Sequence, residues 1–347
     1  METQCLKPAG EAIRFAASLI NKGELVAFPT ETVYGLGADA LNEKAVLSIF
    51  AAKERPADNP LIVHISERSS LTPLCHLTDK AVQLMDAFWP GPLTLLLKKK
   101  AVVPDVTTAG LDTVAVRMPS HPVARALLDA CGCPVAAPSA NRSGRPSPTT
   151  AQHVMEDMAG RIPLVLDGGP CDVGLESTVV DMTGEIPLVL RPGGITPEML
   201  CDVIGPVETA GSILSPLQPG EAAPSPGMRH RHYAPSGMLT LVTGRPENVI
   251  QACRRLYDQA MEEGGKACIL ALSEHLPSYG TRYALDIGSL HRPQEVAARL
   301  FDVLRRMDRE GIHTIFSEVV EASGLGLAIM NRLGRAASFR FYDADRG

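Results

Sequence analysis

A proline-rich segment divides this chain into two parts that must fold around separate cores. The stretch from Ser215 to Pro235 reads SPLQPGEAAPSPGMRHRHYAP, and its prolines favour an extended, semi-stiff backbone over a helix or strand. The 347 residues also exceed the roughly 250 to 300 residues at which a single core stops growing. We therefore predict two domains, residues 8–210 and 238–347, joined by a linker over residues 211–237.

Both parts contain short apolar runs that alternate with helical patterns, an order typical of α/β folds. Before the linker, the pattern predicts helices at residues 11–22 and 43–53 and strands at residues 25–28, 61–64, 93–97, 114–117, 135–137, 164–167, 178–181 and 188–191. After the linker, it predicts a small three-layer α/β domain with strands at residues 239–243, 267–272 and 314–317 and helices at residues 246–263, 293–309 and 325–335.

The composition narrows the possible partners and the compartment. With 33 Lys and Arg against 39 Asp and Glu, the net charge is −6, which disfavours a whole surface devoted to nucleic acid but allows a local basic cleft. Eight scattered cysteines without C-x-x-C spacing predict reduced thiols. No membrane-spanning run or basic leader is visible, so we expect a cytoplasmic protein with no membrane partner.

The first cluster of polar residues lies at Pro29–Ala40. Gly35, Gly37 and Ala40 formally fit the dinucleotide pattern G-x-G-x-x-A, but these glycines do not directly follow a strand, so the pattern is not used for a cofactor. Thr30 and Thr32 would share one side of an extended segment. They are candidates for binding a small polar ligand, although two surface threonines remain an alternative.

The second cluster follows a predicted helix. Lys53 and Arg55 leave the helix end and enter a proline-framed loop before the strand that ends at His64. Two cations there could simply favour the negative end of the helix dipole. Alternatively they bind phosphate, Arg55 as a planar fork and Lys53 as a point charge.

Further polar residues lie at strand ends or in the loops after strands, where a scaffold holds side chains rigidly. The loop of residues 136–150 offers hydroxyl donors and two arginines, which suits a nucleotide triphosphate although no Walker loop is present. Arg117, Ser177 and Arg191 lie at strand ends, and structural salt bridges compete there with binding of anionic ligands. With no Ser-His-Asp or H-E-x-x-H pattern, the residues favour positioning and electrostatic stabilisation over covalent or metal-site catalysis.

Taken in order, eight motifs resemble one family closely. The chain is similar to the threonylcarbamoyl-AMP synthases, in which a YrdC-like α+β twisted-sheet domain with a concave basic cleft precedes a small Rossmann-like C-terminal domain. The motifs are PTETVYGLGA (29–38), K-x-R-P (53–56) with DNPLIVH (58–64), WPGPLT (89–94), VAVRMP (114–119), PSAN (138–141), ESTVVD (176–181), LRPGGI (190–195) and SPGMRHRHYAP (225–235).

This resemblance implies a reaction in which L-threonine, bicarbonate or CO2, and ATP with Mg²⁺ give threonylcarbamoyl-AMP and pyrophosphate. It implies that threonine contacts Thr32, His64, Arg117, Ala137 and Ser177. It further implies that Lys53 and Arg55 are catalytic cations, and that ATP contacts Arg55, Asn59, Thr113, Ser139, Asn141, Ser147, Arg191 and Tyr233. No protein-held metal site is expected.

The resemblance also gives the second half of the linker a role. Its Gly227–Pro235 segment would form a lid that brings Tyr233, beside His232, to the nucleotide and excludes water. Expected partners are a tRNA-modifying transfer complex, in transient contact, and tRNA itself. A non-catalytic RNA-binding module remains an alternative, as does a carbamoyl transferase, although such transferases carry additional domains.

Overall fold

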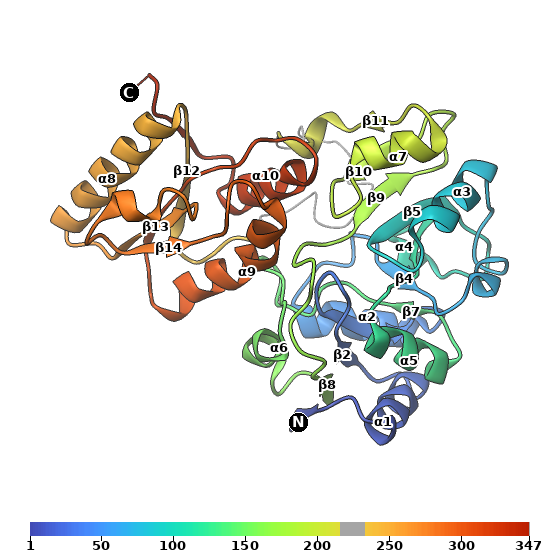
Figure 1. Ribbon diagram of the computed structural model, residues 1–347. Helices are drawn as coiled ribbons and strands as arrows, with labels where there is room; N and C mark the ends of the chain where they lie inside the picture. Colours follow the sequence, from blue (N-terminus) through green and yellow to red (C-terminus); the bar gives the residue numbers. More distant parts are fainter. Residues whose placement is uncertain (216–232, 347) are drawn as a thin grey trace. The chain divides into compact units, whose positions relative to one another are not determined.

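The computed structural model describes residues 1–215 and 233–346, which form two compact units (Figure 1). The first unit contains Met1–Ser143 and Ser147–Ile213, and the second contains most of the chain after the linker. His232 and the other residues of the expected lid before Tyr233 lie outside the described residues. No helix within the described ranges is both long and apolar enough to cross a membrane.

The first unit is built on a mixed sheet. Its described strands pair in the order β1-β8-β2-β3-β7-β4-β6-β5-β9-β10-β11. The strands are β1 (Gln4–Leu6), β2 (Val26–Phe28), β3 (Gly35–Asp39), β4 (Ile62–His64), β5 (Leu93–Lys98), β6 (Thr113–Arg117), β7 (Val135–Ala136), β8 (Leu164–Leu166), β9 (Thr178–Asp181), β10 (Leu188–Arg191) and β11 (Glu208–Thr209). Strands β2, β4 and β6 are buried along their whole length, and their residues are apolar except for His64 at the end of β4 and for Thr113 and Arg117 at the two ends of β6.

Amphipathic helices cover this sheet. The first of them buries its apolar positions against β2, β8 and the fifth helix, forming a core that includes Ile13, Ile20 and Leu127. The helices are α1 (Gly10–Asn21), α2 (Glu43–Lys53), α3 (Asp79–Phe88), α4 (Asp105–Thr108), α5 (Pro122–Cys131), α6 (Ala151–Met158) and α7 (Pro197–Ile204), with short 3₁₀ turns at Arg68–Leu71 and Gly211–Ile213.

Helix α2 ends at the predicted residue for a local reason. The Asn42 side chain accepts hydrogen bonds from Lys44 and Ala45 at its start, and Glu54 adopts a left-handed φ of 53° at its end. Lys53 is the last residue before this turn, and its side chain points into the protein, where only 2% of its surface is exposed. Capping therefore fixes the position of a predicted catalytic cation.

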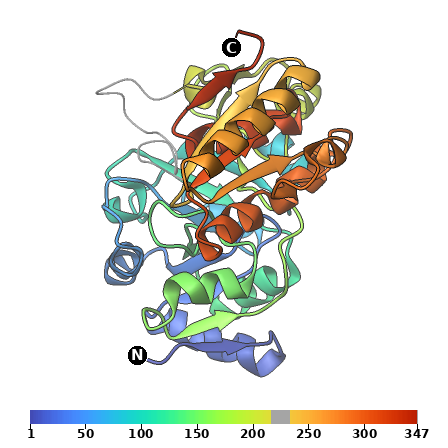
Figure 2. The ribbon, with the colours of Figure 1, turned by 90° about the vertical axis from the view of Figure 1, so that its left-hand side faces the viewer.

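The second unit contains a parallel five-stranded sheet in the order β14-β13-β15-β12-β16 within residues 233–346. Helix α8 packs on β13, and Ile269 lies in that core while its neighbour Leu270 is equally buried on the other face. Both faces are thus covered, with α8 seen along one of them in Figure 2. The elements are β12 (Met238–Thr243), α8 (Pro246–Glu262), β13 (Ala267–Ala271), a 3₁₀ turn (Leu276–Tyr279), β14 (Ala284–Asp286), α9 (Pro293–Arg309), β15 (Thr314–Ser317), α10 (Leu325–Ala336) and β16 (Phe341–Asp343).

Candidate active site

Strand register aligns three polar residues across the first unit's sheet. His64 of β4 lies opposite Arg117 of β6, and Arg117 lies opposite Thr94 of β5. Since residues directly opposite one another project from the same face, these side chains form a row. Two strands further along, Arg191 of β10 lies opposite Val179 of β9 at the same end of the sheet.

Arg117 is the centre of this row. Its Nη1 donates to Thr32 Oγ1 at 2.8 Å, and its Nε donates to the Gly91 carbonyl at 3.3 Å. Its Nη2 lies 2.7 Å from Glu31 Oε1, and 3% of the residue is exposed. The guanidinium is therefore held rigidly in a desolvated setting, where it can recognise a carboxylate strongly.

Glu31 and Thr30 orient this centre from the PTET segment. Burial acts to raise the pKa of the Glu31 carboxyl, but the Arg117 guanidinium and the backbone N–H groups of Glu31 and Ser120 together hold that pKa below its usual range. The Thr30 hydroxyl donates to the Val33 carbonyl at 2.6 Å, which leaves its oxygen to accept from Thr32 at 2.8 Å. Neither Glu31 nor Thr94 was among the predicted site residues. The signal for Glu31 was a charged residue between two threonines in a segment that the structure buries.

His64 is buried and uncharged. Burial, and then the nearby Arg117 cation, lower its pKa to about 3. Its Nδ1 lies 3.2 Å from the Ile62 carbonyl, which can only accept, so Nδ1 carries the proton and Nε2 is left as an acceptor. The ring of Phe28 packs edge-on against it at 6.3 Å. His64 is therefore suited to receive a hydrogen bond from a ligand N–H or O–H.

Ser177 and Arg191 adjoin the same end of the sheet. Ser177 Oγ lies 2.7 Å from Thr94 Oγ1 and accepts from Arg191 Nη2 at 3.2 Å, while Arg191 Nε donates to the Ser177 carbonyl at 3.1 Å. Next to Ser177, the Glu176 carboxylate accepts a short hydrogen bond from Ser147. Arg191 and Ser147, both predicted for ATP, thus connect to the residues predicted for threonine.

Other predicted nucleotide residues lie at the opposite end of the sheet. Thr113 begins the strand that Arg117 ends, and four residues of strand span about 13 Å. Asn59 precedes β4, which runs parallel to β6, so Asn59 lies at the Thr113 end. Ala137 falls between the two ends, with its N–H bound to the Ile62 carbonyl at 2.9 Å.

Lys53 anchors the loop that follows β7. Its Nζ donates to the Asn141 carbonyl at 2.6 Å and, by a shorter contact, to the Ser139 carbonyl. Within this loop, the Ser139 hydroxyl donates to Asn141 Oδ1. The interaction is not the exposed helix-dipole contact that was the alternative. Instead, a buried cation is fixed directly beneath a loop of hydroxyl and amide groups.

Arg55 and Asn59 form a second part of this end. Arg55 Nη2 donates to the Asn59 carbonyl at 3.1 Å, and its guanidinium lies 5.8 Å from the Phe50 ring. The Asn59 side-chain amide is 1% exposed, and neither of its polar atoms has a hydrogen-bond partner within the described chain. Because an unsatisfied buried amide costs about 1–3 kcal/mol, this amide is prepared for a polar ligand.

Tyr233 belongs to the second unit. It has a φ of 64°, is 3% exposed, and packs on Phe301 with ring centroids 5.3 Å apart. The Arg332 guanidinium lies 5.7 Å from its ring. Its predicted contact with ATP stays a prediction.

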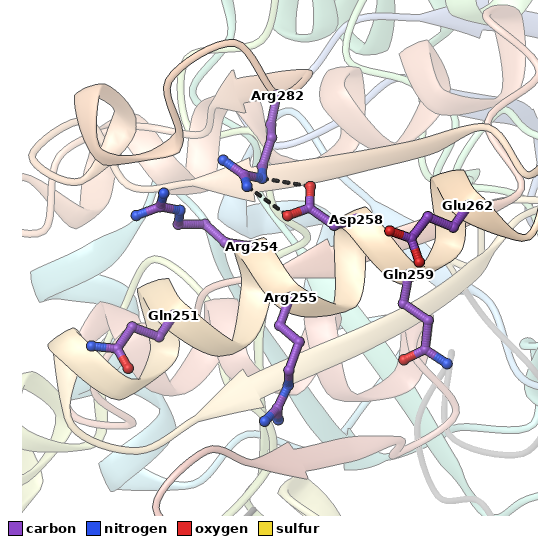
Figure 3. Close-up of a pocket in the computed structure, with 7 residues that line it drawn as sticks. All are labelled: Gln251, Arg254, Arg255, Asp258, Gln259, Glu262 and Arg282. Carbon is purple, nitrogen blue, oxygen red and sulfur yellow. Dashed lines mark hydrogen bonds and ion pairs between the residues drawn. The ribbon is translucent and has the colours of Figure 1, made fainter.

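Two observations limit other kinds of site. Across residues 1–215 and 233–346, no group of three or more His, Cys, Asp or Glu side chains is placed to hold a metal ion. A groove of about 450 Å³ lies on α8, but none of the predicted residues line it. There Arg282 and Asp258 point at one another in a paired contact, with mixed charges around them (Figure 3). We interpret this groove as a solvent-exposed face of α8 with surface ion pairs.

Known proteins share both units. Residues 18–193 match the Sua5/YciO/YrdC family, described as "Telomere recombination", and residues 195–338 match "Threonylcarbamoyl-AMP synthase, C-terminal domain". The threonylcarbamoyl-AMP synthase of Pyrococcus abyssi is 48% identical over 94% of each chain, and that of Bacillus subtilis is 47% identical over 94% of this chain and 92% of its own. A crystal structure of P. abyssi Sua5 complexed with L-threonine superposes with a TM-score of 0.92, at 46% identity, over 99% of this chain and 98% of the other.

Fold and site together define a two-domain α/β protein with a YrdC-like first domain and a parallel-sheet second domain. The chain belongs to the threonylcarbamoyl-AMP synthase family.

Proposed function

We propose that this protein is an L-threonylcarbamoyladenylate synthase, a nucleotidyltransferase that converts L-threonine, bicarbonate or CO2, and ATP into threonylcarbamoyl-AMP and pyrophosphate. The observation that supports it best is that polar groups lie at both ends of β6, because Arg117, which donates to Thr32, ends the strand and Thr113 begins it about 13 Å away. An amino acid joined to a nucleotide is an elongated product that fits such a division. Family membership supports the same reaction.

The Arg117 end is proposed to bind threonine. The guanidinium, held by Thr32 and Glu31, would bind the substrate carboxylate. Neutral His64 would accept a hydrogen bond through Nε2 from the amine or hydroxyl of threonine. Ser177, already bonded to Thr94 and Arg191, would complete the pocket.

The other end is proposed to bind ATP and stabilise developing charge. The carbamate oxygen formed from the threonine amine attacks the α-phosphorus, the bond to the β-phosphate oxygen breaks, and pyrophosphate leaves with its electron pair. Arg55 would meet the leaving phosphates, and Lys53 would add positive charge while it fixes the loop of Ser139 and Asn141. The buried side-chain amide of Asn59 would form hydrogen bonds with the nucleotide.

Mg²⁺ is proposed to enter with the triphosphate. Oxygen ligands suit this ion, and Ser139 and Asn141 present side-chain oxygens to one another in the loop above Lys53. When bound, the ion would neutralise negative charge on the phosphates. We further propose a cytoplasmic protein that passes its labile product to a tRNA-modifying transfer complex, with tRNA as a further partner.

The lid remains part of this proposal. Deleting Gly227–Pro235 should impair turnover, because water would reach the hydrolysable adenylate. The first unit should stay folded, since its core lies before this segment. Full turnover by this variant would remove the lid from the mechanism.

The reaction is tested by pyrophosphate release from the purified protein with ATP, omitting threonine and bicarbonate in turn. Release that needs both substrates supports the synthase. Release that ignores threonine points to another adenylated substrate. Without any release, steeply salt-dependent binding of RNA would support the non-catalytic RNA-binding module instead.

Arg55→Ala tests the proposed role in charge stabilisation. Loss of this cation should lower turnover at least about tenfold, which corresponds to roughly 1.4 kcal/mol of barrier. Arg125→Ala, which removes an exposed arginine of α5, is the matched control and should keep the rate. An unchanged rate for Arg55→Ala would exclude Arg55 from the chemistry.

A further inference from the structure

Tyr34 holds the loop of residues 136–150, the nucleotide loop, which carries several residues proposed for ATP. It follows the PTET segment in the chain and is fully buried. Its backbone N–H donates to the Pro148 carbonyl at 2.8 Å, and its own carbonyl accepts from the Ala140 N–H at 2.8 Å. Ala140 adjoins Ser139, and Pro148 adjoins Ser147. The backbone of Tyr34 therefore holds the nucleotide loop near both of its ends.

The side chain of Tyr34 reaches a second loop. Its hydroxyl donates to the Gly169 carbonyl at 2.6 Å. Gly169 belongs to residues 167–177, the β8–β9 loop, which ends at Ser177, a residue proposed for threonine. Burial raises the pKa of the Tyr34 hydroxyl, so this group stays protonated and remains a donor at neutral pH. A single residue thus connects the β8–β9 loop to the nucleotide loop.

The β8–β9 loop is shaped to receive this hydrogen bond. Gly169 adopts a left-handed φ of 89°, which favours glycine, and its N–H donates to Asp167 Oδ1 at 3.1 Å. A Cβ at Gly168 would lie 2.6 Å from the side chain of Pro29, so this part of the loop packs closely on the PTET segment. The Gly169 carbonyl is therefore held from its own side as well as by Tyr34.

Further along, the β8–β9 loop contacts residues of both proposed binding regions. The Val173 N–H donates to the Glu31 carbonyl at 2.8 Å, and Glu31 holds the guanidinium proposed to bind threonine. The Glu176 carboxylate accepts its short hydrogen bond from Ser147, which is proposed to contact ATP. Because the loop contacts both regions, its displacement would shift one bound substrate relative to the other.

We propose that Tyr34 is a positioning residue whose hydroxyl fixes the β8–β9 loop against the nucleotide loop, so that bound threonine and ATP are aligned for reaction. This role rests on the proposed synthase function. Tyr34 acts through Gly169 on one loop and through its backbone on the other. Since the reaction joins two bound molecules, an error of about 1 Å in their relative placement can lower the rate by up to about 10²-fold. The hydroxyl should therefore affect kcat more than the binding of either substrate.

Tyr34→Phe tests this role, because it removes the hydroxyl and keeps the ring. The kcat for pyrophosphate release should fall about three- to tenfold, while the KM values for threonine and ATP change by less than about twofold. The number of active sites is measured by the amplitude of a single turnover. A merely structural defect would lower this number and leave the rate per active site unchanged.

Hydrogen exchange of the full-length protein without substrates measures the loop directly. In Tyr34→Phe, the amide of Val173 and the peptides that cover the β8–β9 loop should exchange at least about fivefold faster. Helix α1, which packs in the core of the first unit, should keep its exchange rate. Faster exchange confined to the β8–β9 loop would link the loss of kcat to this loop.

Tyr279→Phe is the matched control. Tyr279 is also fully buried, and its hydroxyl donates to Glu318 at 2.6 Å within the second unit. Loss of this hydrogen bond should lower the melting temperature. The kcat and the exchange of the β8–β9 loop should both match those of the unaltered protein.

The results separate this role from the proposed function. If the unaltered protein needs threonine and bicarbonate for pyrophosphate release, and Tyr34→Phe keeps the same kcat, the positioning role is overturned and the synthase function stands. A lower kcat without faster exchange of the β8–β9 loop also overturns the role, because Tyr34 would then not act through Gly169. If the unaltered protein shows no threonine-dependent release, the proposed function is rejected and the positioning role with it.

Discussion

At the scale of single residues, the buried pair of Glu31 and Arg117 determines the geometry of the proposed threonine pocket. Glu31→Gln should destabilise the first unit by about 3–5 kcal/mol, because it leaves a buried guanidinium without its counter-charge. It should also raise the KM for threonine more than that for ATP. Urea unfolding and substrate titrations measure these effects.

The control for that substitution is Asp112→Asn, which removes an exposed pair with Lys98 and should leave the unfolding curve nearly unchanged. If Glu31→Gln raises both KM values equally, Glu31 supports the fold without positioning Arg117 for one substrate.

His64 predicts a pH dependence of stability. Its pKa falls from 6.5 to about 3 on folding, so between these pH values the unfolded chain binds the extra proton. Stability from this residue is therefore fully present above about pH 6.5 and is lost as the pH falls, by at most about 1.4 kcal/mol per pH unit. His64→Gln should flatten the slope of unfolding free energy between pH 4 and 6.5, whereas His76→Gln, at an exposed site, should retain it. Equal slopes in both variants would contradict the prediction.

At the scale of elements, the spacing of apolar residues predicted those helices and strands whose buried face repeats regularly along the sequence. Residues 43–53, 178–181 and 188–191 match α2, β9 and β10 at both ends, and α/β architecture in both units is confirmed. The glycine-rich β3 was not predicted as a strand. A Cβ at Gly37 would lie 2.8 Å from Phe28 and 2.9 Å from Val135, so close packing, not strand propensity, selects glycine there.

In the candidate site too, some features could be predicted from the sequence and others depend on packing between distant segments. Polar residues at strand ends were visible as motifs, but their grouping depends on pairing between strands distant in sequence. No local pattern shows that Arg117 lies between His64 and Thr94, or that Lys53 reaches the loop after β7. Similarly, α3, α5, α6 and α7 were not among the predicted helices.

Gly193 offers a test of how closely two elements must approach. A Cβ at Gly193 would lie 2.3 Å from the Thr178 nitrogen and 2.7 Å from the Glu176 carbonyl oxygen. Both are backbone atoms, so the clash can be relieved only if the backbone moves. Gly193→Ala should cost about 1–3 kcal/mol and displace the segment of Ser177, lowering turnover. Gly211→Ala, which meets no atom within 4 Å, is the control. If Gly193→Ala keeps the activity and the melting temperature of the unaltered protein, then β9 and the loop after β10 can move apart at little cost in free energy.

At the scale of the whole molecule, the two units have separate hydrophobic cores. The first includes Ile20 and Leu127, and the second includes Ile269 and Phe316. All residues proposed for threonine belong to the first unit. Threonine affinity should therefore depend on the first core and not on packing within the second.

Ile269→Ala tests this separation. Ile269 of β13 is fully buried in the core that α8 covers, and its truncation to alanine should destabilise the second unit by about 2–5 kcal/mol. Threonine affinity, measured by calorimetry below the first melting transition, should match that of the unaltered protein. Leu127→Ala, an equally buried change in the first core, should lower the fraction of binding-competent protein. A weaker threonine affinity in Ile269→Ala, with the first unit still folded, would mean that the second unit helps to form the threonine pocket.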